Sequence, residues 1–272
     1  MIRAAVIGWP VSQSRSPLIH GHWLKRFGIE GDYGRVAIEP ERAGDFFAHF
    51  ADSDLAGGNV TIPYKEIAAG AAYHREPVVE RVGAANTLWV EDGVLCADNT
   101  DGSGFVANLD ERAPGWDKTP GEALVLGAGG AAAAVVDALV ERGFSLRIVN
   151  RTLSRAEALA ARYPGRAHAD VLSEANRYAS TAGFIVNTTS LGMKGDGVID
   201  LDMNVVPANA VVTDIVYVPL MTPFLTAAAE RGLRTVDGLG MLLHQAVPGF
   251  RRWFGQQPSV TADLRALIEA DL

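Results

Sequence analysis

The sequence predicts a two-domain α/β protein: an N-terminal, mainly parallel α/β domain, a second α/β domain, and C-terminal helices that pack back on the first. Three observations carry this prediction. β-Branched segments alternate with helical patterns along most of the chain, which is typical of strand–helix–strand units and parallel sheets. A stretch without periodicity, residues 111–121 with Pro114, Gly115, Pro120 and Gly121, interrupts this alternation. The 272 residues are enough for about two domains.

The first domain is predicted from strand patterns bounded by turn or helix signals. Strands are expected at residues 4–8, 33–38, 58–62, 87–91 and 94–97. The last two are joined by Glu91-Asp92-Gly93, a turn sequence that favours a hairpin. Helical patterns between the strands cover residues 17–27, 41–50 and 64–73.

The second domain has a clearer pattern, which begins after a helix that starts near Gly102. Strands are expected at residues 122–127, 145–150, 184–187, 211–216 and 234–236. An Ala/Val-rich helix is expected at 130–142, and Ser154 with Glu157 forms a capping-box pattern that opens the next helix. The tail is helical at 242–254 and 261–270 and has no following strand, so we expect it to pack on the first domain.

Composition excludes several classes of function. With 24 basic and 32 acidic residues the net charge is −8, which argues against a surface for nucleic acid or anionic membranes. No apolar run reaches the ~18 residues of a membrane span, and no signal-peptide pattern is present. A single cysteine, Cys96, excludes an internal disulfide framework and a site of several thiolates. We therefore expect a cytoplasmic protein without a bound metal.

The 29 glycines exceed the usual share of ~7%, and their placement points to a cofactor. A predicted strand runs into Gly127-Ala128-Gly129-Gly130-Ala131-Ala132 and then directly into a helix. This is the G-x-G-x-x-A form of the Rossmann dinucleotide turn in its required context. The first glycine permits the tight turn, the second lets the diphosphate approach the backbone, and the small final residue allows close helix–strand packing. The alternative is an ordinary tight turn between a strand and a helix.

The end of the next strand indicates which dinucleotide binds. It reads Asn150-Arg151-Thr152, with Arg155 one helical turn further on. A free ribose 2′-hydroxyl favours Asp or Glu at this strand end, whereas guanidinium groups pair well with a 2′-phosphate. The sequence therefore favours NADP over NAD, unless the two arginines are only solvated charges at a helix start.

Polar residues also gather at the element junctions of the first domain. A helix N-cap would explain Ser16 but not Ser14. Lys65 is expected in the first turn of a helix, where a cation opposes the helix dipole, so its position needs another reason. Two Asn-Thr pairs, residues 86–87 and 99–100, occupy further junctions. Each feature alone fits a turn or cap, but together at strand ends they indicate a ligand site.

Eight motifs occur in order along the chain: Gly8-x-Pro10-Val-x-x-Ser14-x-Ser16-Pro17-x-x-His20, Asn59-Val-Thr-x-Pro-x-Lys65, Gly83-Ala-x-Asn-Thr87, Asn99-Thr-Asp-Gly102, Gly127-Ala-Gly-Gly-Ala131, Asn150-Arg-Thr152, Tyr217-x-Pro219 and Asp237-Gly-Leu-Gly-Met-Leu-x-x-Gln245. As a set they resemble the shikimate dehydrogenase family over nearly the whole chain. Departures are small. Tyr64 stands where Phe is commoner, so its hydroxyl is unexplained, and Ala97 stands where Gly is usual.

The resemblance implies the reversible reduction of 3-dehydroshikimate to shikimate with NADPH, in the shikimate pathway of aromatic amino-acid biosynthesis. Residues 1–101 and 238–272 would form the substrate-binding domain, and residues 102–237 the Rossmann-type NADP-binding domain. Lys65 and Asp101 would be the catalytic pair. The substrate would be held by Ser14, Ser16, Thr61, Asn86, Tyr217 and Gln245. The cofactor would be bound by Gly127, Ala128, Gly129, Gly130, Ala131, Asn150, Arg151, Thr152, Arg155, Ile215, Gly238 and Met241.

The residue types suit this chemistry. Hydride transfer to a ketone develops an alkoxide that needs a proton donor within ~3 Å, and a lysine beside an aspartate can hold and orient that proton. A substrate with several hydroxyls needs amide and hydroxyl partners, because unpaired buried polar groups are costly. We expect His20 and His244 to be structural hydrogen bonders rather than catalysts.

Three alternatives remain open. The same chemistry on quinate or an aminoshikimate depends on a few pocket contacts, although the two arginines argue against an NAD-preferring quinate enzyme. A non-catalytic dinucleotide-binding regulatory protein would have no use for Lys65 and Asp101. A folate dehydrogenase of related fold would not need the Ser-x-Ser-Pro and Asn-Thr-Asp motifs. The protein is expected to be a monomer or a homodimer.

Overall fold

The computed structural model describes residues 1–193 and 197–272, and the chain divides into two compact units. The first unit comprises Met1–Asp101 with Leu243–Asp271, and the second comprises Gly102–Leu242 with Leu272. The second boundary lies beyond the expected position at 237/238, because helix α10 (Leu239–Phe254) runs from one unit into the other. In the described part of the chain, no helix is long and apolar enough to cross a membrane.

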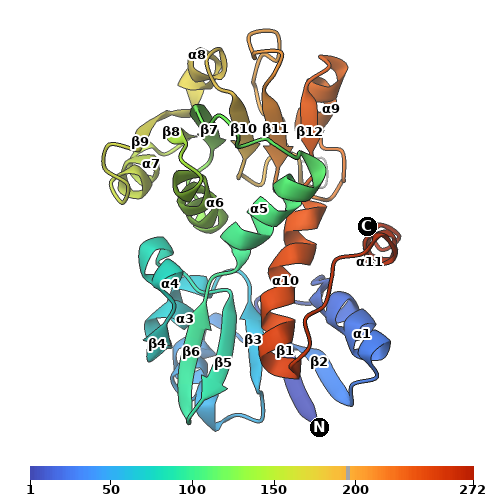
Figure 1. The fold of residues 1–272 in the computed structure, drawn as a ribbon. Helices are drawn as coiled ribbons and strands as arrows, with labels where there is room; N and C mark the ends of the chain where they lie inside the picture. The colour runs from blue at the N-terminus through green and yellow to red at the C-terminus, as the bar shows by residue number, and fades with distance from the viewer. Residues whose placement is uncertain (194–196) are drawn as a thin grey trace. The chain divides into compact units, whose positions relative to one another are not determined.

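The first unit is built on a six-stranded sheet in the order β2-β1-β3-β5-β6-β4 (Figure 1). Its strands are β1 (Ile2–Gly8), β2 (Gly31–Ala37), β3 (Gly57–Val60), β4 (His74–Arg75), β5 (Thr87–Glu91) and β6 (Val94–Asp98). The sheet is mixed, because β5 runs antiparallel to β3 and β6 while the other pairings are parallel. The reversal occurs at Asp92 and Gly93, which both have positive φ, as a two-residue hairpin turn requires. The short edge strand β4 was not predicted.

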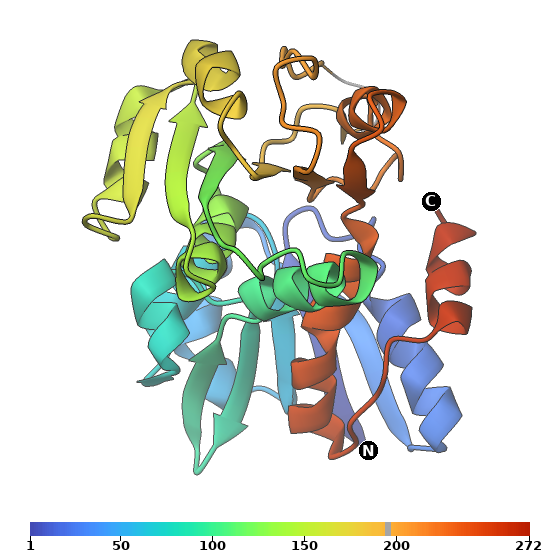
Figure 2. The same ribbon diagram turned by 45° about the horizontal axis from the view of Figure 1, so that its top comes forward.

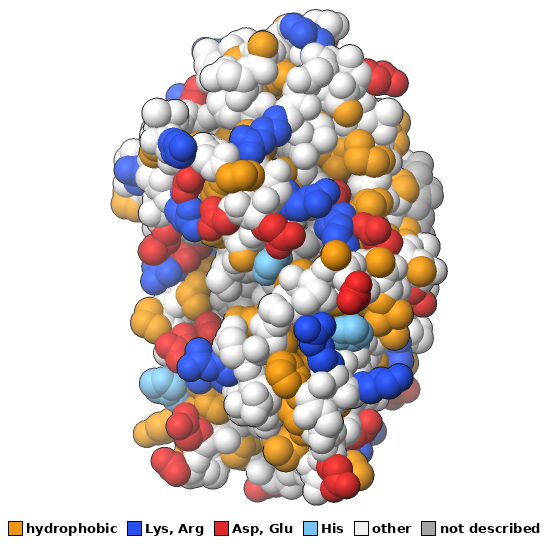
Figure 3. All heavy atoms as spheres, turned by 45° about the vertical axis from the view of Figure 1, so that its right-hand side comes forward, with side chains coloured by type: hydrophobic (Ala, Val, Ile, Leu, Met, Phe, Trp, Pro, Cys, Tyr) orange, Lys and Arg blue, Asp and Glu red, His pale blue; other side chains and the backbone are white. Residues whose placement is uncertain are grey.

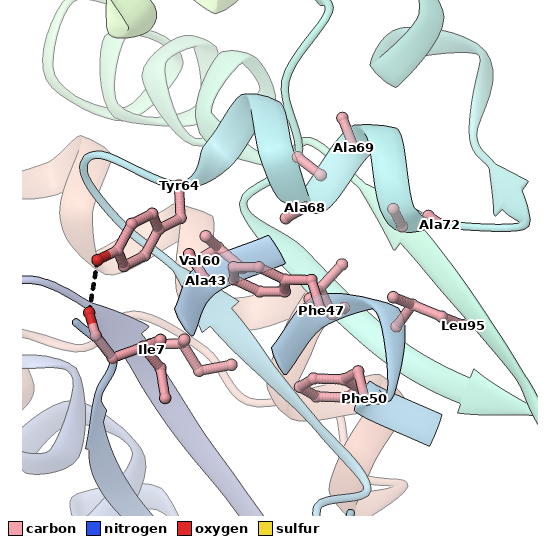
Figure 4. Close-up of a cluster of buried hydrophobic side chains, with 14 of the residues drawn as sticks. Ile7, Ala43, Phe47, Phe50, Val60, Tyr64, Ala68, Ala69, Ala72 and Leu95 are labelled. Atoms are coloured by element: carbon pink, nitrogen blue, oxygen red, sulfur yellow. Dashed lines mark hydrogen bonds between the residues drawn. The ribbon is translucent and has the colours of Figure 1, made fainter. Parts of the chain in front are cut away.

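Helices cover both faces of this sheet. They are α1 (Ser16–Phe27), α2 (Ala43–Ala48), α3 (Lys65–Ala71), α4 (Pro77–Val82), α11 (Ala262–Glu269), the larger part of α10, and the 3₁₀ turns η1 (Pro40–Arg42) and η2 (Phe50–Asp52). On one face, Phe47 and Phe50 pack with Tyr64 against Ile7 and Val60 (Figure 4). The Tyr64 hydroxyl donates a 2.5 Å hydrogen bond to the carbonyl of Ile38. This bond is the reason for a tyrosine where phenylalanine would fill the same space.

The opposite face is aromatic and confirms that the C-terminal helices return to the first domain. The His20 ring stacks on that of Tyr33, with ring centroids 3.9 Å apart, and on that of Phe250 in α10. The ring of Trp253, also in α10, lies tilted against His20. The indole N–H of Trp253 donates to the carbonyl of Leu88 in β5 at 2.8 Å. The tail therefore completes the core of the first unit.

The second unit is built on a six-stranded, fully parallel sheet in the order β12-β11-β10-β7-β8-β9 (Figures 1 and 2). Its strands are β7 (Glu122–Leu126), β8 (Ser145–Asn150), β9 (Ala167–Val171), β10 (Phe184–Asn187), β11 (Val211–Asp214) and β12 (Arg234–Val236). Its helices are α5 (Asp101–Arg112), α6 (Gly130–Glu141), α7 (Leu153–Ala160), η3 (Leu172–Glu174), α8 (Ala175–Ala179) and α9 (Pro223–Glu230). The central strands β7, β10 and β11 are largely apolar because they are buried on both faces.

The two faces of this second sheet have separate cores. On one face, residues of α8 and α9 such as Ala179 and Phe224 pack against Ile185 and Val212. On the other, Phe105 of α5 lies edge-on to Phe184 at 6.2 Å. The α/β architecture with a Rossmann-like second domain is thus confirmed.

Some local expectations for the second unit were wrong. Ser154 and Glu157 lie inside α7, whose N-cap is Thr152 without a side-chain bond, so the capping box does not form. The strand expected at 211–216 ends at Asp214, because the Asp214 carboxylate accepts the Val216 N–H and turns the chain. Strand β9 and helices α8 and α9 were not predicted.

Charged side chains of both signs are interspersed over the described atoms of the face in Figure 3. The net charge of −8 is therefore not concentrated into a single-sign patch on that face.

Candidate active site

Lys65 and Asp101 form an ion pair in the first unit. Lys65 Nζ lies 2.5 Å from Asp101 Oδ2, and the two side chains are 20% and 9% exposed. Each residue opens a helix: Lys65 is the first residue of α3 and Asp101 the first of α5. The helix dipole stabilises the carboxylate and disfavours the ammonium group at these positions. The ion pair compensates for this, which resolves the unfavourable placement of Lys65 noted in the sequence.

Asn86 links this pair to α10. Its side-chain N–H group lies 2.8 Å from Asp101 Oδ1 and 3.2 Å from Gln245 Oε1. Its oxygen accepts hydrogen bonds from the backbone N–H of Thr100 at 2.8 Å and the hydroxyl of Thr87 at 3.0 Å. Asn86 is 2% exposed. The amide orientation is therefore fixed by donors on one side and acceptors on the other.

Three residues that support this cluster were not assigned a role from the sequence. Thr100 donates its hydroxyl proton to the carbonyl of Gln245 at 2.8 Å, and Thr87 bonds Asn86. Asn99 accepts from the backbone N–H of Asp101 at 3.1 Å and donates to the carbonyl of Ala84 at 2.9 Å. The two Asn-Thr pairs were the available signal, but their mutual bonding appears only in the fold.

His20 is connected to this cluster through Asn59. Its Nε2 faces Asn59 Oδ1 at 3.2 Å, and the hydroxyl of Tyr33 donates to the same oxygen at 2.7 Å. Asn59 in turn donates to the carbonyl of Asn86 at 3.3 Å. Burial lowers the pKa of His20 to about 3, so its ring is neutral at physiological pH.

Ser14 and Ser16 lie together at the start of α1. Helix α1 begins at Ser16 with Arg15 as its N-cap, one residue earlier than expected. Ser14 Oγ lies 3.3 Å from both the backbone nitrogen and the hydroxyl oxygen of Ser16. Thr61 is half-buried beyond the end of β3, where its N–H donates to Ile7 in β1 at 2.9 Å. All three hydroxyls belong to the first unit, as do Lys65 and Asp101.

The glycine-rich turn of the second unit has the conformation that its sequence predicts. Gly127 has φ +108, and a Cβ there would lie 2.7 Å from Thr188 Oγ1, so no other residue fits. Gly129 and Gly130 are exposed, and a Cβ on either would meet nothing within 4 Å. The protein itself does not require glycine at these two positions. The space beside these two glycines is open and lies at the N-terminus of α6. A helix N-terminus with open space beside it suits the diphosphate of a dinucleotide.

The basic residues after β8 also fit a phosphate. Arg151 and Arg155 are exposed, and neither has a carboxylate partner among the described residues. Asn150 donates its side-chain N–H to the carbonyl of Thr152 at 2.9 Å, which shapes this turn. Ala128 and Ala131 flank the glycines and are half-buried.

The remaining expected residues lie near the carboxyl end of β11 and the start of α10. Ile215 and Tyr217 are half-buried in the segment after β11, and Met241 is buried in α10. A Cβ at Gly238 would lie 2.5 Å from the carbonyl oxygen of Ile215. Gly238 is thus required by close packing of the backbone. Tyr217 belongs to the second unit, unlike the other expected substrate residues.

These features define a class of protein: a two-domain α/β protein with a glycine-rich dinucleotide turn in one unit and a partly buried Lys–Asp pair among amides and hydroxyls in the other. Among the described residues, no group of three or more His, Cys, Asp and Glu side chains is placed to hold a metal.

Comparison with known proteins identifies the family. Residues 6–88 match the shikimate dehydrogenase substrate binding domain, residues 115–194 the shikimate/quinate 5-dehydrogenase model, and residues 238–268 the shikimate 5′-dehydrogenase C-terminal domain. A shikimate dehydrogenase (NADP(+)) of Azorhizobium caulinodans is 57% identical over 273 residues, covering 100% of this chain and 97% of that protein. The chain belongs to the shikimate dehydrogenase family.

Solved structures agree with this assignment. Shikimate 5-dehydrogenase from Thermus thermophilus, in complex with NADP(H) and shikimate, has a TM-score of 0.89 at 35% identity, with 100% of both chains covered. A quinate dehydrogenase from Corynebacterium glutamicum, in complex with NAD, has a TM-score of 0.88 at 28% identity, with 99% of both chains covered.

Proposed function

We propose that this protein interconverts 3-dehydroshikimate and shikimate with NADP(H), as a step of the shikimate pathway. The observation that carries the proposal is the Lys65–Asp101 ion pair at 2.5 Å, held by Asn86 in a chain of the shikimate dehydrogenase family. A protein that only binds a dinucleotide has no need of such a proton donor. The arginines after β8 favour NADP over NAD.

Lys65 is the proposed proton donor. When NADPH is bound, it supplies the hydride that reduces the ketone of the substrate. The Lys65 ammonium group protonates the alkoxide oxygen as it forms, and in the oxidation direction the neutral amine takes the proton of the hydroxyl. Asp101 keeps Nζ in place through Oδ2, while Oδ1 stays bonded to Asn86. The carboxylate therefore orients the lysine in both directions of the reaction.

Amide and hydroxyl side chains form the proposed binding site for the substrate's polar groups. Asn86 and Gln245 are buried and oriented by their neighbours before substrate arrives, which reduces the entropy lost on binding. The remaining proposed substrate residues are Ser14, Ser16, Thr61 and Tyr217. The first unit is thus the proposed substrate domain.

The second unit is the proposed NADP domain. The turn from Gly127 to Ala131 would hold the diphosphate through backbone N–H groups at the start of α6. Arg151 and Arg155 would clamp the 2′-phosphate, with Asn150 and Thr152 shaping their turn. Ile215, Gly238 and Met241 are the proposed nicotinamide-side residues. The single Cys96 supports a cytoplasmic location, and a monomer or homodimer is the proposed oligomeric state.

A cofactor-by-substrate activity matrix tests the proposal. Initial rates would be measured for shikimate and quinate oxidation with NADP and with NAD, and for 3-dehydroshikimate reduction with NADPH and with NADH. Shikimate with NADP should give the highest kcat/KM of the oxidations, and exchanging NADP for NAD should lower it about tenfold or more. No turnover of shikimate alongside turnover of quinate would refute the assignment.

A further inference from the structure

A buried carboxylate at the end of β11 has no role in the proposed function so far. Asp214 is 0% exposed. Its Oδ1 accepts hydrogen bonds from the Asn187 side chain and the Val216 backbone N–H, both at 2.9 Å, and its Oδ2 accepts from the Thr222 hydroxyl at 2.7 Å. Burial raises the pKa of Asp214 to about 6, so the group is ionised at neutral pH. Its surroundings thus supply three donors to two carboxylate oxygens.

These bonds close the segment 215–222 at both ends. Val216 lies at its start, and Thr222 at its end, where the Thr222 hydroxyl also caps α9 by accepting the N–H of Leu225 at 3.3 Å. Within the segment, the N–H of Ile215 donates to the carbonyl of Asn187 at 3.1 Å. The segment also carries Tyr217. Asp214 therefore determines the path of the chain that presents Ile215 and Tyr217.

Asn187 connects the same carboxylate to the glycine-rich turn. The Asn187 side-chain oxygen accepts from the backbone N–H and the hydroxyl of Thr189 at 2.9 and 2.7 Å. The hydroxyl of the preceding residue, Thr188, donates to the carbonyl of Leu126 at 2.8 Å, and Thr188 lies beside Gly127. One amide and one carboxylate thus fix two loops at the carboxyl end of the parallel sheet.

We propose that Asp214 is a positioning residue that holds Ile215 and Tyr217 in the geometry needed for hydride transfer. The inference rests on the proposed function, because it assigns Ile215 to the cofactor and Tyr217 to the substrate. Asp214 acts through the backbone and Thr222, not by touching either ligand. A carboxylate suits this position because three donors converge on it and a single amide oxygen would leave one of them poorly satisfied.

Substitutions at Asp214 test the proposal. Asp214→Ala removes both carboxylate oxygens and with them all three hydrogen bonds, so we expect kcat for shikimate oxidation to fall about 30-fold or more and the KM for shikimate to rise. Asp214→Asn keeps an oxygen for Asn187 and Val216 and should recover kcat to within about fivefold of wild type. Adenosine 2′,5′-bisphosphate lacks the nicotinamide half, and its dissociation constant, measured by calorimetry, should stay within about twofold in both variants.

Asp170 offers a matched control in the same unit. Its carboxylate also accepts two hydrogen bonds, from the Tyr178 hydroxyl at 2.6 Å and the Val171 N–H at 2.8 Å, but it lies on the edge strand β9. Asp170→Ala should leave kcat unchanged. If Asp214→Ala does not fold, Thr222→Val and Thr222→Ser replace it. The valine should lower kcat while the serine, which keeps the hydroxyl, should not.

Hydrogen–deuterium exchange separates this inference from the proposed function. Peptides that cover 215–222 should exchange faster in Asp214→Ala than in wild type, while those of β7 and α6 should not change, whether or not shikimate is a substrate. Absence of shikimate turnover by wild type would refute only the proposed function. Unchanged exchange in 215–222, a kcat within threefold of wild type, or equal loss of kcat and bisphosphate binding would each overturn the positioning role.

Discussion

The proposed sites in the two units differ in the groups that form them: bonded side chains in the first unit, and backbone with exposed arginines in the second. In the first unit, Asp101 bonds both Lys65 and Asn86, and Asn86 is held in turn by Thr87 and Gln245. In the second, the glycine-rich turn presents backbone, and Arg151 and Arg155 extend into solvent without carboxylate partners among the described residues. One site is ordered before its ligand binds, while the other leaves donors available for it.

This difference assigns different kinetic consequences to the two sites. Groups already in place contribute to the transition state without further ordering, so changing them should lower kcat. Exposed cations that meet a phosphate only on binding contribute equally to the ground state and the transition state, so changing them should raise KM. The predictions below test this division.

The largest effect is expected for Lys65→Ala. Loss of the proposed proton donor should lower kcat by about 10³-fold or more, with the KM for shikimate changed by less than about threefold. Steady-state shikimate oxidation with NADP measures both constants. Lys25, exposed in α1, offers the control substitution Lys25→Ala, which should have no effect. A rise in KM at constant kcat would make Lys65 a binding residue only.

The pH dependence of stability should have opposite signs for two buried groups, Asp214 in the second unit and His20 in the first. Asp214 has a pKa raised from 3.8 to about 6 by burial, among uncharged neighbours Asn187, Thr222 and the Val216 amide. The stability that its protonated form contributes is complete below about pH 4 and is lost as the pH rises through about 6. As the pH rises from 4 to 8, wild type should therefore lose about 3 kcal/mol of unfolding free energy that Asp214→Asn, which cannot ionise at this position, does not lose.

Denaturant titrations across this pH range measure the difference, and His20 in the first unit supplies the contrast. Burial lowers the pKa of His20 from 6.5 to about 3, so the stability of its neutral form is present above pH 6.5 and is lost as the pH falls toward 3. As the pH falls, the unfolding free energy of His20→Phe should therefore rise relative to that of wild type. A difference for Asp214→Asn that does not vary with pH would contradict the account.

Among variants of the first unit, Asn86→Ala should have the next largest effect on catalysis. It removes the amide that orients Asp101 and Gln245, so kcat/KM for shikimate should fall about 30-fold while the KM for NADP stays within about twofold. The exposed Asn176, which bonds only the backbone of Asp202 among the described residues, gives the control Asn176→Ala. Full activity of Asn86→Ala would show that Lys65 and Asp101 need no such support.

The smallest effect is expected for Arg151→Ala. Loss of one guanidinium from the proposed phosphate clamp should raise the KM for NADP about tenfold and leave the constants for NAD unchanged. Initial rates with both cofactors measure this selectivity. Arg177, exposed on α8, is the matched control. An equal effect on NADP and NAD would exclude a contact with the 2′-phosphate.

Local patterns in the sequence predicted much of this architecture. The strand–turn–helix context identified the glycine turn, and Lys65 drew attention because a cation at a helix start is unfavourable. The alternation of strands and helices gave the α/β class, although the hairpin at Asp92 and Gly93 makes the first sheet mixed. Each of these signals lies within a few residues of the chain.

What the sequence did not predict depends on contacts between distant segments. Asn86 bonds Gln245, which lies far along the chain on α10, and Tyr64 bonds the carbonyl of Ile38. In the sequence Asp214 is one residue of a predicted strand, and its three hydrogen-bond donors are brought to it only by the fold. Edge strand β9, with its short and partly exposed sequence, lacks the apolar pattern of a buried strand.

The measurement that tests the division between the two proposed sites most directly is the kinetics of Lys65→Ala, Arg151→Ala and the double variant with NADP and with NAD. The account predicts that Lys65→Ala lowers kcat by the same factor with either cofactor, that Arg151→Ala raises only the KM for NADP, and that the two effects multiply in the double variant. A change of cofactor preference in Lys65→Ala, or a loss of kcat with NAD in Arg151→Ala, would contradict it.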